Sequence, residues 1–118
     1  MPRSKTSSAM SNTPERDLAG VFAALGDTTR LALVTRLLAA GALSATALSD
    51  GQAITRQAIV KHLQVLVAAR LVVHERHGKE VLYAVDPRRI EEARAFLAAI
   101  AEGWDKTLGR LKSLVEAP

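Results

Sequence analysis

Residues 54–73, ITRQAIVKHLQVLVAARLVV, combine a helical repeat of apolar residues with a second face that carries no acid. Ile59, Leu63 and Leu66 follow one another at spacings of four and three, which is the period of an amphipathic α-helix. Thr55 precedes the repeat, and its hydroxyl can cap the first free amides of that helix. The stretch therefore predicts a short helix that buries one side and presents the other.

The exposed side of this predicted helix carries side chains suited to DNA. It offers cations, amides, a threonine and a valine: Thr55, Arg56, Gln57, Val60, Lys61 and Gln64. A surface helix without a partner usually mixes acids with its cations, whereas phosphates and base edges are met by Arg, Lys and Gln. The pattern favours a nucleic-acid contact over a merely solvated face.

The composition predicts one globular domain with an aliphatic core. The chain has 118 residues, of which 48% are hydrophobic and only 3% aromatic, and this length is one domain by size. The net charge of +4 is concentrated in residues 54–80, where five Lys or Arg stand against two Glu. Such a charge permits an anionic partner.

Several classes of protein are not expected from this sequence. The chain has no cysteine, which excludes disulfides and thiolate metal sites. It has no apolar run of 18 residues and no secretory signal, so a cytoplasmic protein without a membrane partner is expected. Residues 1–13 are rich in Ser and Thr without any period, which predicts a disordered tail before a domain at 14–118.

Three helices are predicted before the opening stretch. The first begins near Pro14, a residue favoured at the first helical position. The second runs from the break at Gly26 and Asp27 to about Ala40, and Gly41 ends it. Its inward residues are expected to be Leu31, Val34, Leu37 and Leu38, with Arg30 and Arg36 outside. A short third helix at residues 44–50 and the basic helix form a helix-turn-helix pattern.

A hairpin with a basic tip is predicted directly after the basic helix. Residues 71–76 and 81–85 are short strand-like runs joined by a link that contains Gly78. Three side chains at the tip are candidates for contact with DNA: Arg76, His77 and Lys79. A helix-turn-helix followed by such a hairpin is a winged helix, whose wing reaches the backbone or the minor groove. Ordinary solvated turn charges are the alternative reading.

The last predicted helix runs from Pro87 to about Val115 and is roughly 43 Å long, more than a domain of this size needs for its own core. Its apolar residues Ile90, Ala93, Leu97, Ile100, Trp104, Leu108, Leu111 and Val115 have spacings close to a heptad seam. We expect a second copy of the chain to pair through the first and last helices. The predicted dimer contacts are Leu18, Val21, Phe22, Leu97, Ile100, Trp104, Leu108 and Leu111.

Four stretches resemble the ArsR family of bacterial winged-helix repressors. FAALGDTTR at 22–30 is similar to the family's "ALADPTRR" opening, and IVKHLQVL at 59–66 with ARLV at 69–72 is similar to its "VSKHLKVLxxAGLV" recognition helix. Residues 82–83 match the "LY" of the second wing strand, and 104–114 resemble the "FWxxRLxxLxxYL" tail of a cysteine-poor branch. The departures are Thr28 where Pro is usual, Val60 where Ser often contacts phosphate, and Arg70 where Gly normally closes the helix.

The resemblance implies a mainly α fold with a small β-hairpin (α+β), with five helices and a two-stranded wing. It also implies a homodimeric repressor that binds a near-palindromic operator, often at its own promoter, and is released by a signal. Many members sense metals, but the last helix here has no histidine, while His62 lies on the recognition helix and His74 and His77 are expected on opposite faces of a strand. We therefore expect no metal or cofactor, and a small-molecule effector remains open.

An enzyme and a non-specific binding module are the two other classes of function to compare with a specific regulator. No cysteine nucleophile, Gly-rich phosphate loop or serine with a placed base is present, so an enzyme is not expected. A non-specific nucleoid-type or protein-interaction module would share the basic helix. It differs from a repressor in the ratio of specific to non-specific affinity.

Overall fold

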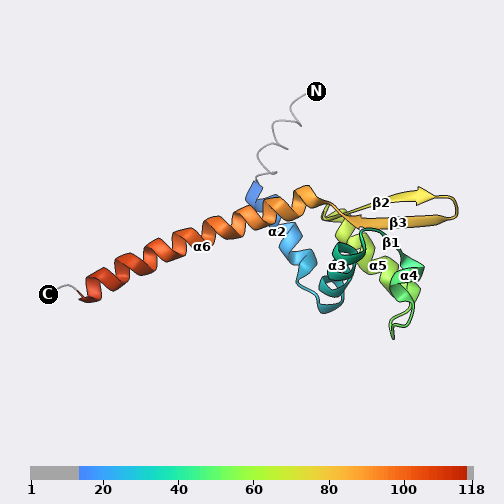
Figure 1. The fold of residues 1–118 in the computed structure, drawn as a ribbon, viewed down its shortest axis with the longest axis horizontal. Coiled ribbons are helices and arrows are strands. Elements are labelled where there is room, and N and C mark those ends of the chain that lie inside the picture. The colour runs from blue at the N-terminus through green and yellow to red at the C-terminus, as the bar shows by residue number, and fades with distance from the viewer. Residues whose placement is uncertain (1–13, 117–118) are drawn as a thin grey trace, which may run out of the picture.

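The computed structural model describes residues 14–116, and the tail predicted at residues 1–13 lies outside them. Within the described range the fold is mainly helical, with a small antiparallel sheet (Figure 1). Its elements are α2 (Pro14–Leu25), α3 (Thr28–Ala40), β1 (Leu43–Ser44), α4 (Ala45–Ser49), α5 (Arg56–Ala68), β2 (Val72–His77), β3 (Glu80–Val85) and α6 (Pro87–Glu116). The predicted winged helix-turn-helix with five helices is confirmed.

The sheet has three strands, in the order β1-β3-β2, rather than the two of the predicted hairpin. The short β1 pairs antiparallel with β3, with Leu43 opposite Tyr83 and Ser44 opposite Leu82. A strand of two residues has no alternation that a sequence pattern can reveal, so only its pairing with β3 defines it. Ser44 also accepts a hydrogen bond from the Ala47 amide at 3.1 Å and caps α4. This strand therefore ties the start of the helix-turn-helix to the base of the wing.

The core lies between the helices and the inner end of the sheet. The predicted apolar side of α5 is fully buried, because Ile59, Leu63 and Leu66 are each 0% exposed. Leu18 and Val21 of α2, predicted as dimer contacts, are buried in the same core, at 7% and 0% exposed. They therefore leave little surface for a second chain.

The buried face of α3 matches the predicted one at Val34 and Leu37 but not at Leu31 and Leu38. Leu33, Val34 and Leu37 are buried, whereas Leu31 and Leu38 are 52% and 57% exposed. Since α3 is rich in Leu and Ala around most of its circumference, its apolar period does not select a single face. Packing against the neighbouring helices makes that choice.

Arg30 and Arg36, predicted to lie outside, instead join α3 to its neighbours. Arg30 Nε donates to the Ala24 carbonyl at 2.6 Å, near the end of α2. Arg36 Nη1 donates to the Leu48 carbonyl of α4, also at 2.6 Å. Carbonyls in the last turn of a helix have no intrahelical partner, which makes them good acceptors for a cation.

The long α6 starts on the domain and then runs away from it (Figure 1). Ala93 is buried, and the ring of Phe96 lies 6.0 Å from the ring of Phe22 on α2. Further along, the rest of the apolar seam and the adjacent Leu114 are exposed to solvent: Leu97, Ile100, Trp104, Leu108, Leu111, Leu114 and Val115. Among residues 14–116, no element covers this part of the seam.

Also within that range, no single helix is long and apolar enough to cross a membrane, although the bent pair α2–α3 passes the same test by length and composition.

Aspartates stand at the start of two helices and accept backbone hydrogen bonds there. The Arg30 amide donates to Asp27 at 3.0 Å, and the Arg88 amide donates to Asp86 at 3.0 Å. These hydrogen bonds are the main cause that lowers the pKa of each carboxyl group, since they stabilise its charged form. Both side chains therefore stay ionised through the neutral range.

The free energy of unfolding is expected to decline as the pH falls below the ordinary aspartate pKa of about 3.9. A carboxyl group whose pKa is lower in the folded state contributes stability above its unfolded pKa, and this is lost as the pH falls through its folded pKa. Urea denaturation followed by circular dichroism, from neutral pH down into this acid range, measures the effect. The double variant Asp27→Asn/Asp86→Asn keeps two capping side chains without the titration, so its stability should depend less steeply on pH. An equally steep dependence would contradict the role of these two groups.

Candidate nucleic-acid interface

The helix-turn-helix consists of α4 and α5, and the side of α5 that faces away from the core is open to solvent. The Thr55 hydroxyl accepts the Ala58 amide at 3.1 Å and caps α5, as predicted. The predicted DNA-contacting residues Arg56, Gln57, Lys61 and Gln64 are all exposed. The helix thus presents its cations and amides while its apolar side is held in the core.

A groove of about 330 Å³ lies between α4, the first half of α5 and the wing. Its lining residues are Ser44, Ala45, Thr46, Arg56, Val60, Arg76, Lys79, Glu80, Val81 and Tyr83. The fold therefore brings Arg56 and Val60 of the predicted helix together with Arg76 and Lys79 of the predicted wing. The remaining predicted residues of α5, Gln57, Lys61 and Gln64, are exposed outside this groove.

Thr46 contributes a contact that the sequence did not indicate. Arg56 Nε donates to Thr46 Oγ1 of α4 at 3.0 Å, which orients the arginine along the groove. A guanidinium has five N–H donors, so this one bond leaves capacity for a base edge or a phosphate. The sequence signal was only an exposed hydroxyl on a short helix, which is common on any surface.

Val60 is half-buried and packs against the core while it also forms part of the groove wall. An isopropyl group cannot donate to a phosphate, so its contribution to an interface is apolar contact. Ser is usual at this position in the ArsR family and often contacts phosphate there, so Val60 is a departure in chemistry as well as in sequence.

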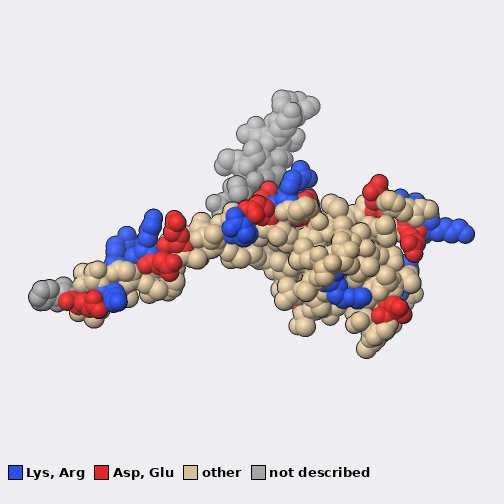
Figure 2. Space-filling view, in the orientation of Figure 1, with Lys and Arg blue, Asp and Glu red and all other residues tan. Residues whose placement is uncertain are grey.

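The wing carries both signs of charge (Figure 2). Its tip turns at Gly78, which has a φ of +65°, and His77 pairs with Glu80 in the register of β2 and β3. Arg76 Nη1 donates to the Gly78 carbonyl at 3.4 Å, and His77 Nε2 lies 3.5 Å from the Glu75 carboxylate. Two acids thus accompany the cations of the tip, so its charge is less uniform than that of α5.

The other two histidines make contacts within the domain. His62 Nδ1 lies 3.8 Å from the carboxylate of Asp27, which links α5 to the start of α3. His74 stacks on Tyr83 across the wing at 5.7 Å between ring centroids. Among residues 14–116, no three His, Asp or Glu side chains are grouped closely enough to hold a metal ion.

The end of α5 has the backbone form that usually requires glycine. Arg70 adopts a φ of +62°, which costs an L-residue about 1–2 kcal/mol. The Arg70 amide donates to the Val67 carbonyl at 2.9 Å, and the Leu71 amide donates to the Leu66 carbonyl at 3.1 Å. These two bonds form a Schellman motif. Arg70 therefore stands where the family usually has Gly, and the turn that leads from α5 into the wing still forms.

Comparisons with known proteins agree with this geometry. Residues 25–75 match a helix-turn-helix domain family. The chain is 34% identical over 94 residues to the HTH-type transcriptional regulator Rv2034 of Mycobacterium tuberculosis, covering 80% of this chain and 84% of that protein.

Solved structures give the same result over most of the chain. An ArsR-like transcriptional regulator from Rhodococcus sp. RHA1 superposes with a TM-score of 0.75 at 36% identity, covering 86% of this chain and 95% of that one. The ArsR family transcriptional regulator RHA00566 superposes with a TM-score of 0.68 at 26% identity, covering 80% of this chain and 95% of that one. With its helix-turn-helix, its wing and these relatives, the chain belongs to the ArsR family of DNA-binding transcriptional regulators.

Proposed function

We propose that this regulator is a homodimeric repressor that acts in the cytoplasm on a near-palindromic operator, including one at its own promoter. The observation that carries the proposal is the groove in which Arg56 of the recognition helix lies with Arg76 and Lys79 of the wing. Cations from two separate elements line one concave surface, which suits the curved, negatively charged backbone of a duplex. Occupying the promoter then blocks the polymerase.

The recognition helix would enter the major groove from its N-terminal end. Arg56 and Gln57 stand in its first turn, where helix-turn-helix proteins contact base edges, and Arg pairs with guanine while Gln pairs with adenine. Lys61 and Gln64 follow on the same exposed side and would hold phosphates or flanking bases. Thr55 and Val60 lie at the edge of this contact, and Arg76, His77 and Lys79 would contact the backbone from the wing.

The dimer is proposed from the exposed seam of α6. Seven large apolar residues of one helix lie open to solvent, among them Trp104 at 60% exposure. A contiguous apolar surface of this kind marks a protein interface, and its heptad spacing fits a second helix of the same kind. Two copies related by a two-fold axis would place two recognition helices on successive half-sites. Phe22, half-buried beside Phe96, stands at the start of this surface.

A footprint of the purified protein on the DNA upstream of its own gene tests the proposal. A protected near-palindrome with half-sites about 10 bp apart, or a multiple of it, is the expected result at near-physiological salt. Binding to all sequences that disappears with modest salt would show that only sequence-independent electrostatic attraction holds the protein on DNA. The non-specific nucleoid-type reading would then replace the repressor.

Arg56→Ala and Lys79→Ala are expected to weaken operator binding in different ways. Arg56→Ala should weaken the free energy of operator binding by about 1–3 kcal/mol and relax the preference at one base pair, because a base contact carries sequence information. Lys79→Ala should weaken binding to all sequences and reduce the salt slope by about 1, because it removes one phosphate contact. Fluorescence anisotropy on the operator and on point-substituted operators, at several salt concentrations, separates the two.

Arg94→Ala is the matched control for these variants. Arg94 is an exposed arginine of α6 that pairs with Glu91 at 2.6 Å, outside the groove. Its loss should leave operator affinity and the salt slope unchanged. If all three variants behaved alike, the face assigned to DNA would be wrong.

A further inference from the structure

The hydrogen bond between Thr46 and Arg56 joins the two helices of the helix-turn-helix at the wall of the DNA groove. Arg56 Nε lies 3.0 Å from Thr46 Oγ1, and both side chains line the groove of about 330 Å³. Thr46 is the second residue of α4, and Arg56 is the first residue of α5. The contact therefore connects the side chain proposed to read a base edge with a helix to which no base contact is assigned.

Thr46 stands on a helix that is held at both ends. At the start of α4, the Ser44 hydroxyl accepts the Ala47 amide at 3.1 Å, and Ser44 belongs to β1, which pairs with β3. At the end of α4, the Arg36 guanidinium donates to the Leu48 carbonyl at 2.6 Å and to the Ala47 carbonyl at 3.4 Å. The Thr46 hydroxyl is therefore presented to the groove from a fixed position.

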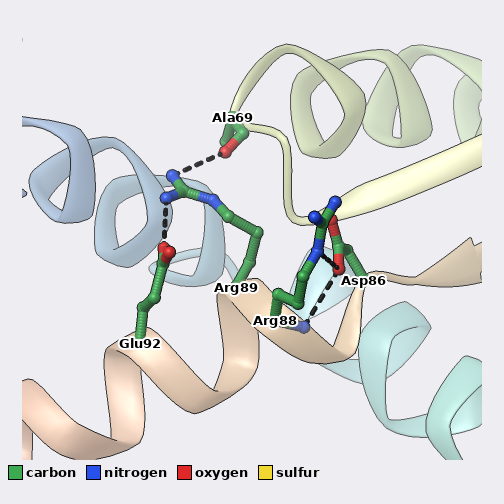
Figure 3. Close-up of polar contacts among 5 residues, drawn as sticks. All are labelled: Ala69, Asp86, Arg88, Arg89 and Glu92. Atoms are coloured by element: carbon green, nitrogen blue, oxygen red, sulfur yellow. Dashed lines mark hydrogen bonds and ion pairs between the residues drawn. The ribbon is translucent and has the colours of Figure 1, made fainter.

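The backbone of the recognition helix α5 is also fixed. At its far end, Arg89 of α6 is 6% exposed and donates to the Ala69 carbonyl at 3.2 Å, while it pairs with Glu92 at 2.7 Å (Figure 3). Near its start, Ile59 lies one turn after Arg56 and is fully buried in the core. The direction in which the Arg56 guanidinium points therefore depends on the rotamers of its own side chain.

The hydrogen bond to Thr46 restricts both the orientation and the free donors of Arg56. Arg56 is exposed, and ordering a long, exposed side chain opposes binding. The bond selects one orientation before DNA binds and occupies Nε–H, so the two Nη groups at the end of the guanidinium are left. Together these two groups match the O6 and N7 acceptors of guanine, whereas adenine presents an amino donor in place of O6.

We infer that Thr46 is a positioning residue for base recognition, because it fixes Arg56 for an end-on contact with one guanine of the operator. When a duplex covers the groove and excludes water, the hydrogen bond between the two side chains strengthens. Thr46 thus influences which sequence is bound without a base contact of its own. The specificity role rests on the proposed repressor function, whereas the contact between Thr46 and Arg56 in the DNA-free protein does not.

The full-length, DNA-free protein tests the contact. T46V keeps the branched shape of the side chain and removes the hydroxyl, whereas T46S keeps the hydroxyl. In ¹H–¹⁵N NMR spectra of the arginine Nε–H groups, the Arg56 signal should shift in T46V and exchange faster with water, and T46S should retain the original signal. An Arg56 signal that is the same in T46V and the original chain would overturn the inference.

Fluorescence anisotropy on the operator tests the specificity role, at the base pair where Arg56→Ala loses its preference. T46V should reduce the preference for guanine over adenine there by about two- to tenfold, the cost of ordering one long side chain. T46S should restore it. T35V is the matched control, because Thr35 is exposed on α3 and its hydroxyl donates to the Leu31 carbonyl at 2.9 Å, outside the groove. T35V should bind like the original chain.

A double-mutant cycle shows whether Thr46 acts through Arg56. In an R56A background, T46V should cause no further loss of affinity, and circular dichroism checks that each variant remains folded. An equal loss in both backgrounds, or an unchanged guanine preference in T46V, would overturn the positioning role. A protein that gives the expected Arg56 signals but protects no operator would instead contradict the proposed repressor, and the specificity role with it.

Discussion

Leu66→Ala is expected to lower the free energy of unfolding by about 2–5 kcal/mol, the range for removing a buried leucine side chain from a packed core. Leu66 is 0% exposed in the recognition helix. Its backbone carbonyl also accepts the Leu71 amide in the turn that leads to the wing. Urea denaturation followed by far-ultraviolet circular dichroism measures the loss. Since the free energy of unfolding of small domains is only about 5–15 kcal/mol, this substitution should remove a large part of it.

Val65→Ala is the control for this prediction, because Val65 is the preceding residue of the same helix and is 42% exposed. Truncating Val65 should lower the free energy of unfolding much less than truncating Leu66. Equal losses in the two variants would show that α5 does not bury the face assigned to it.

Trp104→Glu is expected to separate the proposed dimer into folded monomers. The side chain is 60% exposed in the single chain, so the substitution leaves the core of the protomer intact. In a dimer it would bury a carboxylate in an apolar seam, and the dissociation constant should rise on the order of 100-fold or more. Analytical ultracentrifugation over a range of concentrations measures the constant, and circular dichroism checks that the helices persist.

Ser113→Glu places the same charge on the opposite side of α6. Ser113 follows Trp104 by nine residues, which is about 180° around a helix. This variant should remain dimeric and keep its operator affinity, whereas Trp104→Glu should bind an operator far more weakly because only one half-site is engaged at a time. A dimeric Trp104→Glu protein would show that the seam of α6 is not the interface.

The sequence alone determined the elements whose signals are local. The apolar spacing of Ile59, Leu63 and Leu66, with Thr55 before it, defined a capped amphipathic helix that the structure confirms. The link around Gly78 defined the wing, and the long seam defined α6. Each of these signals depends on residues within a few positions of one another, so no knowledge of the rest of the chain is needed.

The tertiary structure decided the features that depend on partners distant in the sequence. β1 exists only because residues 43–44 meet β3 some forty positions later, and the buried face of α3 was chosen by its neighbours. The pairing of Arg56 with Thr46 and the burial of Arg89 against Ala69 likewise join separate elements. Hydrogen bonds and packing between such elements form only in the folded chain. The sequence near any one of these residues does not indicate which distant residue it will contact.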